Sequence, residues 1–436
     1  RPRPDAPSRP QLNRFAIRKR ASLKLTLAAL VALCLASAAV IEGCGDDGEN
    51  EPDRILRIYT SQPLVGGRGG GDTLNAIRIA VEDAGSSFGG AKLEVVGLND
   101  AAPSGAFDPA LVRRNANRAA RDDSTIAFIG DFDSGATEIS MPILNRAGIL
   151  QVSSASTAVQ LTRSTPAEAK QLRPSGIRNF GRVVPNDSVQ SAAMGLFMNE
   201  ESVSRVFVVD DGGVYGTGLA GLFDKVAARA DIEVEGRRTI DRSTKFKALA
   251  KQIDGSGAQA LFFAGSDLDL AYHLFRTAHH EDIHLKLFGG DAIAIRGFLR
   301  TLGELELDTY VTAPMLPEGN YASSGESFLS GFRDRYGRDA EPMAVFGYEA
   351  GLVVDDSIRN ETRGDVRTAP IATLRKGVRD KFFQTTERPS ALGSYSIDAY
   401  GDTTLTFYGA YRVENGRLVL GRAIDPPLSY LEVVGK

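Results

Sequence analysis

From Ile55 onward, short segments rich in Val and Ile alternate with longer segments whose apolar residues recur at helical spacing. Short runs of β-branched and aromatic residues are typical of buried strands, and the longer segments are typical of helices packed on a sheet. Strands that alternate with helices form parallel sheets covered by helices on both faces. The sequence therefore predicts an α/β fold.

The alternation runs through two successive units. In the first unit we expect strands at 55–60, 92–98, 125–129 and 149–153, and helices at 73–84, 109–121 and 135–147. In the second we expect strands at 205–209, 233–239, 258–263, 284–288 and 309–312, and helices at 188–199, 216–230, 244–253, 267–278 and 292–302. Polar and Pro residues at 164–177 interrupt the rhythm between the two units. The length of 436 residues also suggests more than one domain.

The last part of the chain differs from both units. We expect helices at 326–336, 343–359 and 368–381, then strands at 393–397, 404–412 and 417–420, with a hairpin turn at Asn415-Gly416. No low-complexity linker separates the units, so we expect two doubly wound Rossmann-like lobes joined by a three-strand hinge. The second crossing is expected near Ala313 and the third near Leu392. The N-terminal lobe would combine 55–183 with 314–391, and the C-terminal lobe 184–313 with 392–436.

Residues 1–43 have the order of residues found in a secretory signal. A basic stretch that ends at Lys24 precedes an apolar run from Leu25 to Ile41, and a polar, acidic tether follows at 44–54. The Gly43-Cys44 pair resembles the lipobox of bacterial lipoproteins, which implies that Cys44 is lipidated, although Glu42 departs from the small or apolar residue usual there. The alternative is an uncleaved N-terminal anchor. Both interpretations place the body outside the cytoplasm, in the periplasm or at the cell surface.

Charge and cysteine content limit the partners. Residues 1–43 hold eight Lys/Arg and two Asp/Glu, so the totals of 51 and 55 leave 43 basic and 53 acidic residues, a net charge of −10 beyond residue 43. We find no local basic patch, and so expect neither a nucleic-acid partner nor binding to an anionic membrane surface. Cys34 and Cys44 are the only cysteines. This excludes a disulfide scaffold, a Cys-based zinc site and thiol catalysis in the mature body.

Four polar loops follow expected strands, and in open α/β sheets such loops line the ligand crevice. The first loop, 61–72, contains Gly66-Gly67-Arg68-Gly69-Gly70-Gly71, and the second, 130–137, contains Ser134. The third loop, 153–157, is rich in hydroxyl groups, and the fourth, 289–291, ends with Asp291. The Gly-rich loop lacks the Lys-Ser/Thr of a P-loop, so we interpret it as a mobile loop near the hinge. For Ser134 and Asp291 simple helix N-capping is the competing interpretation.

The order and spacing of the loops resemble those of the branched-chain amino-acid-binding proteins of ABC importers, which have the type I periplasmic-binding fold. The motifs are Phe128-Ile129-Gly130 with Ser134-Gly135-Ala136-Thr137, Ala147-Gly148-Ile149 with 153–157, Asp210-Asp211-Gly212-Gly213-Val214-Tyr215-Gly216, Phe288-Gly289-Gly290-Asp291 and Phe346-Gly347-Tyr348-Glu349-Ala350. The resemblance runs from about Ile55 to the C-terminus. It implies a leucine-binding-like protein that closes over an amino acid or amide and delivers it to an ABC permease.

Carried over by position, the resemblance implies that Ser134 and Thr157 hold the ligand carboxylate, helped by the backbone of Ala155 and Ser156. Tyr215 would pack on the ligand from the second lobe. Asp291 would accept the ammonium group. The arrangement is physically sensible, because a zwitterion removed from water needs both of its charges paired.

Two positions depart from the family pattern. Many members place an aromatic ring in the first loop, where this chain has Gly69-Gly70-Gly71, and the chain contains no Trp. A second aromatic ring, common after the third strand of the second lobe, is replaced by Ser266-Asp267. We therefore include Ser266 among the ligand contacts and expect a side-chain pocket wider or more polar than leucine requires.

Two alternative functions stay open, a ligand-sensing receptor module of the same fold and an exported hydrolase. A hydrolase would use Ser134 or the histidine cluster formed by His273, His279, His280 and His284. Ser134 lacks the Gly-x-Ser-x-Gly elbow, and no His lies in a recognisable partner motif. Because metal ligands normally converge from a spaced motif, we interpret the histidines as a surface cluster. We therefore expect no catalysis, no metal and no cofactor.

Overall fold

The structure is a computed structural model that describes residues 54–364 and 366–435. The expected signal segment, most of the tether and Cys44 lie outside the described residues. Within the described ranges, no helix is long and apolar enough to cross a membrane.

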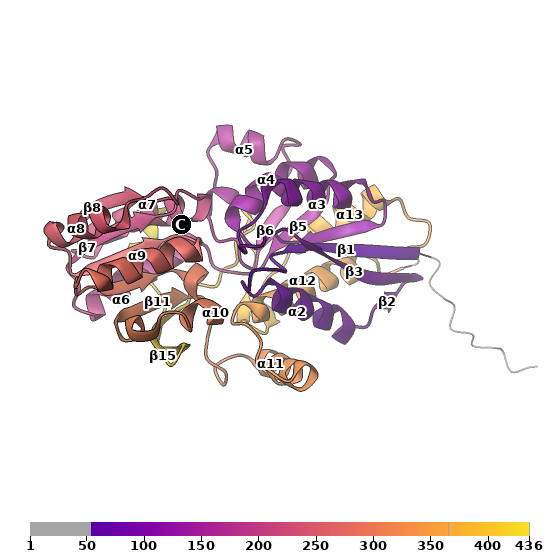
Figure 1. Ribbon diagram of the computed structural model, residues 1–436. Helices are drawn as coiled ribbons and strands as arrows, with labels where there is room; N and C mark the ends of the chain where they lie inside the picture. Colours follow the sequence, from indigo (N-terminus) through magenta and orange to yellow (C-terminus); the bar gives the residue numbers. More distant parts are fainter. Residues whose placement is uncertain (1–53, 365, 436) are drawn as a thin grey trace, which may run out of the picture. The chain divides into compact units, whose positions relative to one another are not determined.

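Two separate sheets carry the fold (Figure 1). The first sheet contains β1 (Arg54–Gln62), β2 (Ser87–Phe88), β3 (Ala91–Asn99), β4 (Thr125–Ile129), β5 (Leu150–Ser153) and β6 (Phe180–Arg182). Its order is β2-β3-β1-β4-β5-β6, and all neighbours are parallel except β2 and β3. The parallel strands of the first unit are thus confirmed.

Helices cover both faces of the first sheet because its strand residues alternate between two cores. Ile58 of β1 packs in the core that contains Ile77 of α2 (Gly70–Asp83) and Val354 of α12 (Ala344–Glu361). Tyr59, the next residue, faces the opposite core with Ala116 of α3 (Pro109–Arg121). α4 (Ser134–Arg146) packs beside α3, and α13 (Ile371–Phe382) packs beside α12.

The second sheet has the order β15-β14-β11-β10-β9-β7-β8, with β14 and β15 antiparallel to their neighbours. Its strands are β7 (Arg205–Asp210), β8 (Glu233–Thr239), β9 (Ala260–Ala264), β10 (Lys286–Gly289), β11 (Thr309–Ala313), β14 (Tyr408–Glu414) and β15 (Arg417–Ile424). α6 (Asp187–Glu200) and α7 (Val214–Arg229) share one core with Phe262. Residues of α8 (Phe246–Ser256) and α9 (Leu268–His280) share the other core with Phe263.

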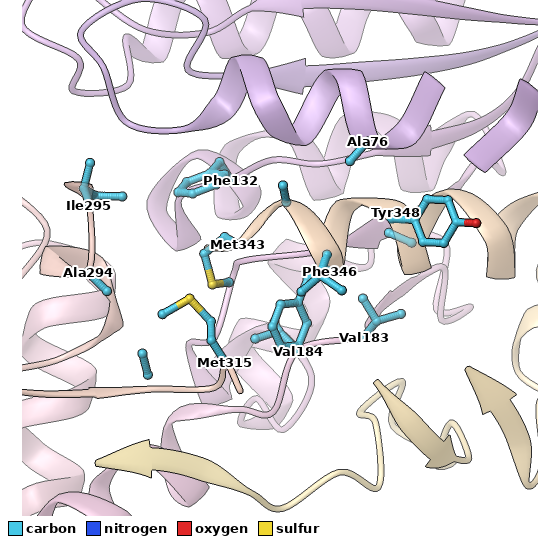
Figure 2. Close-up of a cluster of buried hydrophobic side chains, with 14 of the residues drawn as sticks. Ala76, Phe132, Val183, Val184, Ala294, Ile295, Met315, Met343, Phe346 and Tyr348 are labelled. Atoms are coloured by element: carbon cyan, nitrogen blue, oxygen red, sulfur yellow. The ribbon is translucent and has the colours of Figure 1, made fainter. Parts of the chain in front are cut away.

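The chain passes between the two sheets three times. It leaves the first sheet after β6, returns after β11 through α11 (Ser323–Tyr336) to α12, and leaves again after β12 (Arg388–Ser390) and β13 (Gly393–Tyr395) to form β14. Val184 and Met315, from the first two passages, lie in one apolar cluster with Met343 and Phe346 (Figure 2). This cluster ties the passages to the start of α12.

Several local expectations were wrong. A single helix at 292–302 does not form. The structure has two 3-10 turns, Asp291–Ile293 and Gly303–Asp308, and a short α10 (Arg296–Leu299). A helix also forms within 164–177. It is α5 (Pro166–Leu172), which begins with a capping box between Thr165 and Glu168. The last expected strand pair begins at Tyr408 rather than at residue 404.

The expected absence of a basic patch was also wrong. Arg113, Arg114, Arg118 and Arg121 are exposed on α3 and line an open groove beside Tyr59. Ala and Asn separate these arginines in the sequence, so they form no charged run. A helix nevertheless brings residues three and four apart onto one side.

Candidate functional site

In both sheets the strand order reverses at one point, and this point opens at the carboxyl ends of the strands. In the first sheet β1 lies between β3 and β4, and in the second β7 lies between β8 and β9. The connections on either side of such a point run to opposite faces of the sheet and leave a crevice between them. Ligands of open α/β proteins bind in that crevice.

Loops from both sheets enclose one cavity with about 430 Å³ of free space, part of which is open to solvent. The lining residues come from strand ends and helix starts. They are Arg68, Phe132, Asp133, Ser134, Ala155, Thr157, Tyr215, Ser266, Asp291, Ala292, Ile295 and Met343. Six of the seven ligand contacts expected from the sequence therefore line one cavity.

One wall suits an anion. Ser134 is the first residue of α4, and the side chain of the preceding Asp133 makes no capping hydrogen bond to the helix. The Ser134 hydroxyl accepts a hydrogen bond from the Ala158 amide at 3.2 Å, so its proton is free to be donated. Thr157 adds a second buried hydroxyl to the same wall. A helix start with convergent hydroxyl groups favours a carboxylate.

An internal ion pair fixes this wall from behind. Arg182 is fully buried and donates to the carbonyls of Ser156 and Ala158 at 2.8 and 2.9 Å. Its Nε donates to Asp402 at 2.8 Å, and Asp402 also pairs with Arg163. The loop that contains Thr157 is thus held by residues of β6 and of the third passage between the sheets.

Ser156 does not line the cavity. Its hydroxyl donates to the Asp131 carbonyl at 2.9 Å and lies 2.7 Å from the Thr137 hydroxyl. Its amide donates to the Ser153 hydroxyl at 2.9 Å, and the amide of Ala155 donates to the same atom at 3.2 Å. Ser156 therefore supports the loop from inside.

The opposite wall suits a cation. Asp291 follows β10, and Tyr215 donates a hydrogen bond to its Oδ1 at 2.9 Å. Burial raises the pKa of Asp291 to about 6, against hydrogen bonds from Tyr215 and Gln190 that lower it, and no Lys or Arg is among the main causes of the shift. A Cβ at Gly290 would collide with the Tyr215 hydroxyl, so this contact requires glycine. A buried carboxylate without a cation favours an ammonium ligand.

A second carboxylate, Asp187, lies close to both Asp291 and Thr157. It is fully buried at the start of α6, its amide donates to the Thr157 carbonyl at 2.9 Å, and the Thr157 hydroxyl lies close enough to lower the pKa of its carboxyl. Burial, together with the nearby Asp291, raises the pKa of Asp187 to about 8. At neutral pH Asp187 is therefore mostly protonated, which leaves the negative charge on Asp291.

Sequence reasoning missed part of the lining. Phe132, Ile295 and Met343 form an apolar section of the wall and come from three distant segments (Figure 2). Arg68 lies in the Gly-rich loop, which was interpreted as mobile, yet its side chain is 5% exposed. The available signal was a single charged residue within a run of glycines.

The other candidate sites lie elsewhere. His273, His279 and His280 are on α9 and His284 follows it, and none of them lines the cavity. Among the described residues, no group of three or more His, Cys, Asp or Glu is placed to hold a metal ion. Ser266 does line the cavity, and its loop is fixed by Asp211, whose Oδ2 accepts from the amides of Ser266 and Asp267.

The chain is similar to known proteins over most of its length. Residues 65–391 match the periplasmic binding protein family. An amino acid binding protein of Pseudomonas aeruginosa is 27% identical over 278 residues, which cover 62% of this chain and 68% of the relative.

Two solved structures share the fold. The leucine binding protein LivK of Thermotoga maritima has a TM-score of 0.73 at 21% identity and matches 85% of this chain and 99% of its own. LivJ of Streptococcus pneumoniae, in complex with isoleucine, has a TM-score of 0.70 at 17% identity and matches 86% of this chain and 100% of its own. The expected type I periplasmic-binding fold is confirmed.

Proposed function

Because this chain belongs to the periplasmic binding protein family, we propose that it captures a small amino acid or amide outside the cytoplasm and delivers it to an ABC importer. The observation that carries the proposal is the separation of charge in one cavity. Hydroxyl groups and a helix start, which suit an anion, form one wall, and Asp291, which suits a cation, belongs to the other. A zwitterionic amino acid matches both walls.

The mechanism is closure of two lobes without chemistry. The proposed lobes are 55–183 with 314–391 and 184–313 with 392–436, hinged at the three passages. Ser134 and Thr157 belong to one lobe, and Tyr215, Ser266 and Asp291 belong to the other. Only a ligand that bonds to both stabilises the closed state, since a ligand shifts an equilibrium by its difference in affinity.

Two parts of the proposal concern the membrane. Lipidation of Cys44 would tether the protein at the outer face of the cytoplasmic membrane or at the cell surface. An ABC permease would then receive the ligand. Mass spectrometry of the membrane fraction tests the first part, and uptake of the labelled ligand with and without this protein tests the second. If cells that lack this ligand-binding protein still took up the ligand at the same rate, the result would favour a sensor of the same fold.

The binding test is thermal unfolding of the purified protein against amino acids, amides and small carboxylates. A ligand at a hundredfold its Kd stabilises the folded state by about 2.7 kcal/mol. Zwitterionic amino acids should raise the midpoint in the unaltered protein and not in Asp291→Asn. Asp269→Asn, at an exposed position, is the matched control. Stabilisation only by carboxylates without an amine would contradict the assignment of Asp291.

A further inference from the structure

The cavity wall contains an ion pair with unused hydrogen-bonding capacity. Arg68 and Asp133 both line the cavity, and their side chains are 5% and 9% exposed. Arg68 Nη2 lies 3.5 Å from Asp133 Oδ1. Arg68 Nε and Asp133 Oδ2 are buried and have no partner in the described chain. One donor and one acceptor therefore stand unpaired beside each other.

Neither group is used by the local fold. Asp133 occupies the N-cap position of α4, where an Asp side chain normally bonds the helix amides, yet it makes no such bond. Arg68 follows the exposed Gly66 and Gly67, but its side chain turns inward and its stem packs against Gly105. Buried polar groups are nearly always paired, because leaving one unpaired is unfavourable. Both atoms are thus available to a bound molecule.

We propose that the ligand is an amino acid with a carboxamide side chain, glutamine or asparagine. Its amide carbonyl would accept from Arg68 Nε, and its amide NH₂ would donate to Asp133 Oδ2. The inference rests on the proposed function, because Ser134, Thr157 and Asp291 hold the α-carboxylate and α-ammonium groups. Phe132, Ile295 and Met343 would pack against the methylene groups of the side chain.

The pair distinguishes a carboxamide from its relatives. A leucine side chain satisfies neither Arg68 Nε nor Asp133 Oδ2. The carboxylate of a glutamate side chain would accept a hydrogen bond from Arg68, but it has no donor for Asp133 Oδ2 and would be repelled by that carboxylate. Sites that hydrogen-bond a substrate group reject analogues lacking that group by large factors, because the buried polar atoms stay unpaired.

The test is calorimetric titration of the purified protein with L-glutamine, L-asparagine, L-leucine and L-glutamate. We expect glutamine or asparagine, or both, to bind a hundredfold or more tighter than leucine and glutamate. In Arg68→Met, affinity for that amide should fall at least tenfold while leucine is bound no more weakly. In Asp133→Asn, glutamate should gain at least tenfold relative to the amide. Arg113→Met, on the exposed side of α3, is the matched control and should change nothing.

The outcomes separate the two proposals. Leucine binding as tightly as both amides would overturn the carboxamide inference and leave the proposed function intact. Equal loss for all amino acids in Arg68→Met would also overturn it, since the residue would then be structural. If neither an amino acid nor a simple amide binds the unaltered protein, the proposed function itself fails. Should Arg68→Met not fold, the glutamate-to-amide ratio of Asp133→Asn decides alone.

Discussion

The two walls of the cavity suit ligand groups of opposite charge, and they do so with different kinds of residues. The wall from the first sheet presents hydroxyl groups and a helix start, and its loop is fixed by the internal pair of Arg182 and Asp402. The wall from the second sheet presents Asp291, whose ionised form is disfavoured by burial, with Asp187 close to it. The first wall is preorganised by its internal hydrogen bonds, whereas in the second wall a bound cation would offset the cost of burying the ionised Asp291. Under the proposed function, orientation of the ligand would depend on the first wall, and selection for an amine would depend on the second.

Removing the support of the first wall should have the largest effect. Arg182→Met leaves the buried Asp402 with the partly exposed Arg163 as its one cationic partner among the described residues. Breaking a buried pair costs about 3–5 kcal/mol of unfolding free energy. Arg163→Met should cost far less, because Arg182 keeps Asp402 paired. Urea unfolding measures both, and equal losses would contradict the assigned support.

Neutralising the second wall should remove selection for the amine. Asp291→Asn should weaken binding of the preferred amino acid about thirtyfold or more, since truncating one partner of a buried charge pair costs about 2–5 kcal/mol. A carboxylate ligand without an amine should lose less than about threefold, a small fraction of the same range. Titration calorimetry measures both. An equal loss for both ligands would mean that Asp291 shapes the wall without selecting charge.

The pH dependence of stability should report Asp187. Its folded pKa of about 8 lies above an unfolded value of roughly 4. The stability from this group is therefore fully present below about pH 4 and is lost as the pH rises to about 8. Asp187→Asn should remove a slope on the order of 1 kcal/mol per pH unit between pH 5 and 8. Parallel curves for the two proteins in urea unfolding would contradict the shifted pKa.

A single hydroxyl on the first wall should have the smallest effect. Thr157→Val keeps the shape of the side chain and removes one hydrogen bond to the ligand carboxylate. Such a bond contributes about 1.5 kcal/mol, which corresponds to roughly tenfold in affinity. Thr157→Ser keeps the hydroxyl and should stay within about threefold of the original affinity, well below that tenfold step. If the two substitutions behaved alike, the Thr157 hydroxyl would not contact the ligand.

The sequence predicted the parallel strands and long helices, because apolar periodicity over many residues reflects the core that they share. It also located Ser134, Thr157, Tyr215 and Asp291, which lie in the loops after strands or at the helix starts that follow them, where position in an α/β fold decides exposure to the crevice. Arg68 and Asp187 escaped prediction. Asp187 follows Asn186, the N-cap of α6, and has the sequence context of an ordinary acidic residue in a first helical turn. Burial of a single charge depends on distant segments that pack around it.

Arg182 and Asp402 are 220 residues apart in the chain. As the protein is synthesised from its N-terminus, the strands of the first sheet emerge long before the carboxylate that completes their binding loop. Contacts between such distant residues form late, because the intervening chain must first be closed into a loop. We therefore expect competence to hold a ligand to appear only after the third passage between the sheets has been made. Ligand retention is consequently a direct assay of whether a newly made chain has matured.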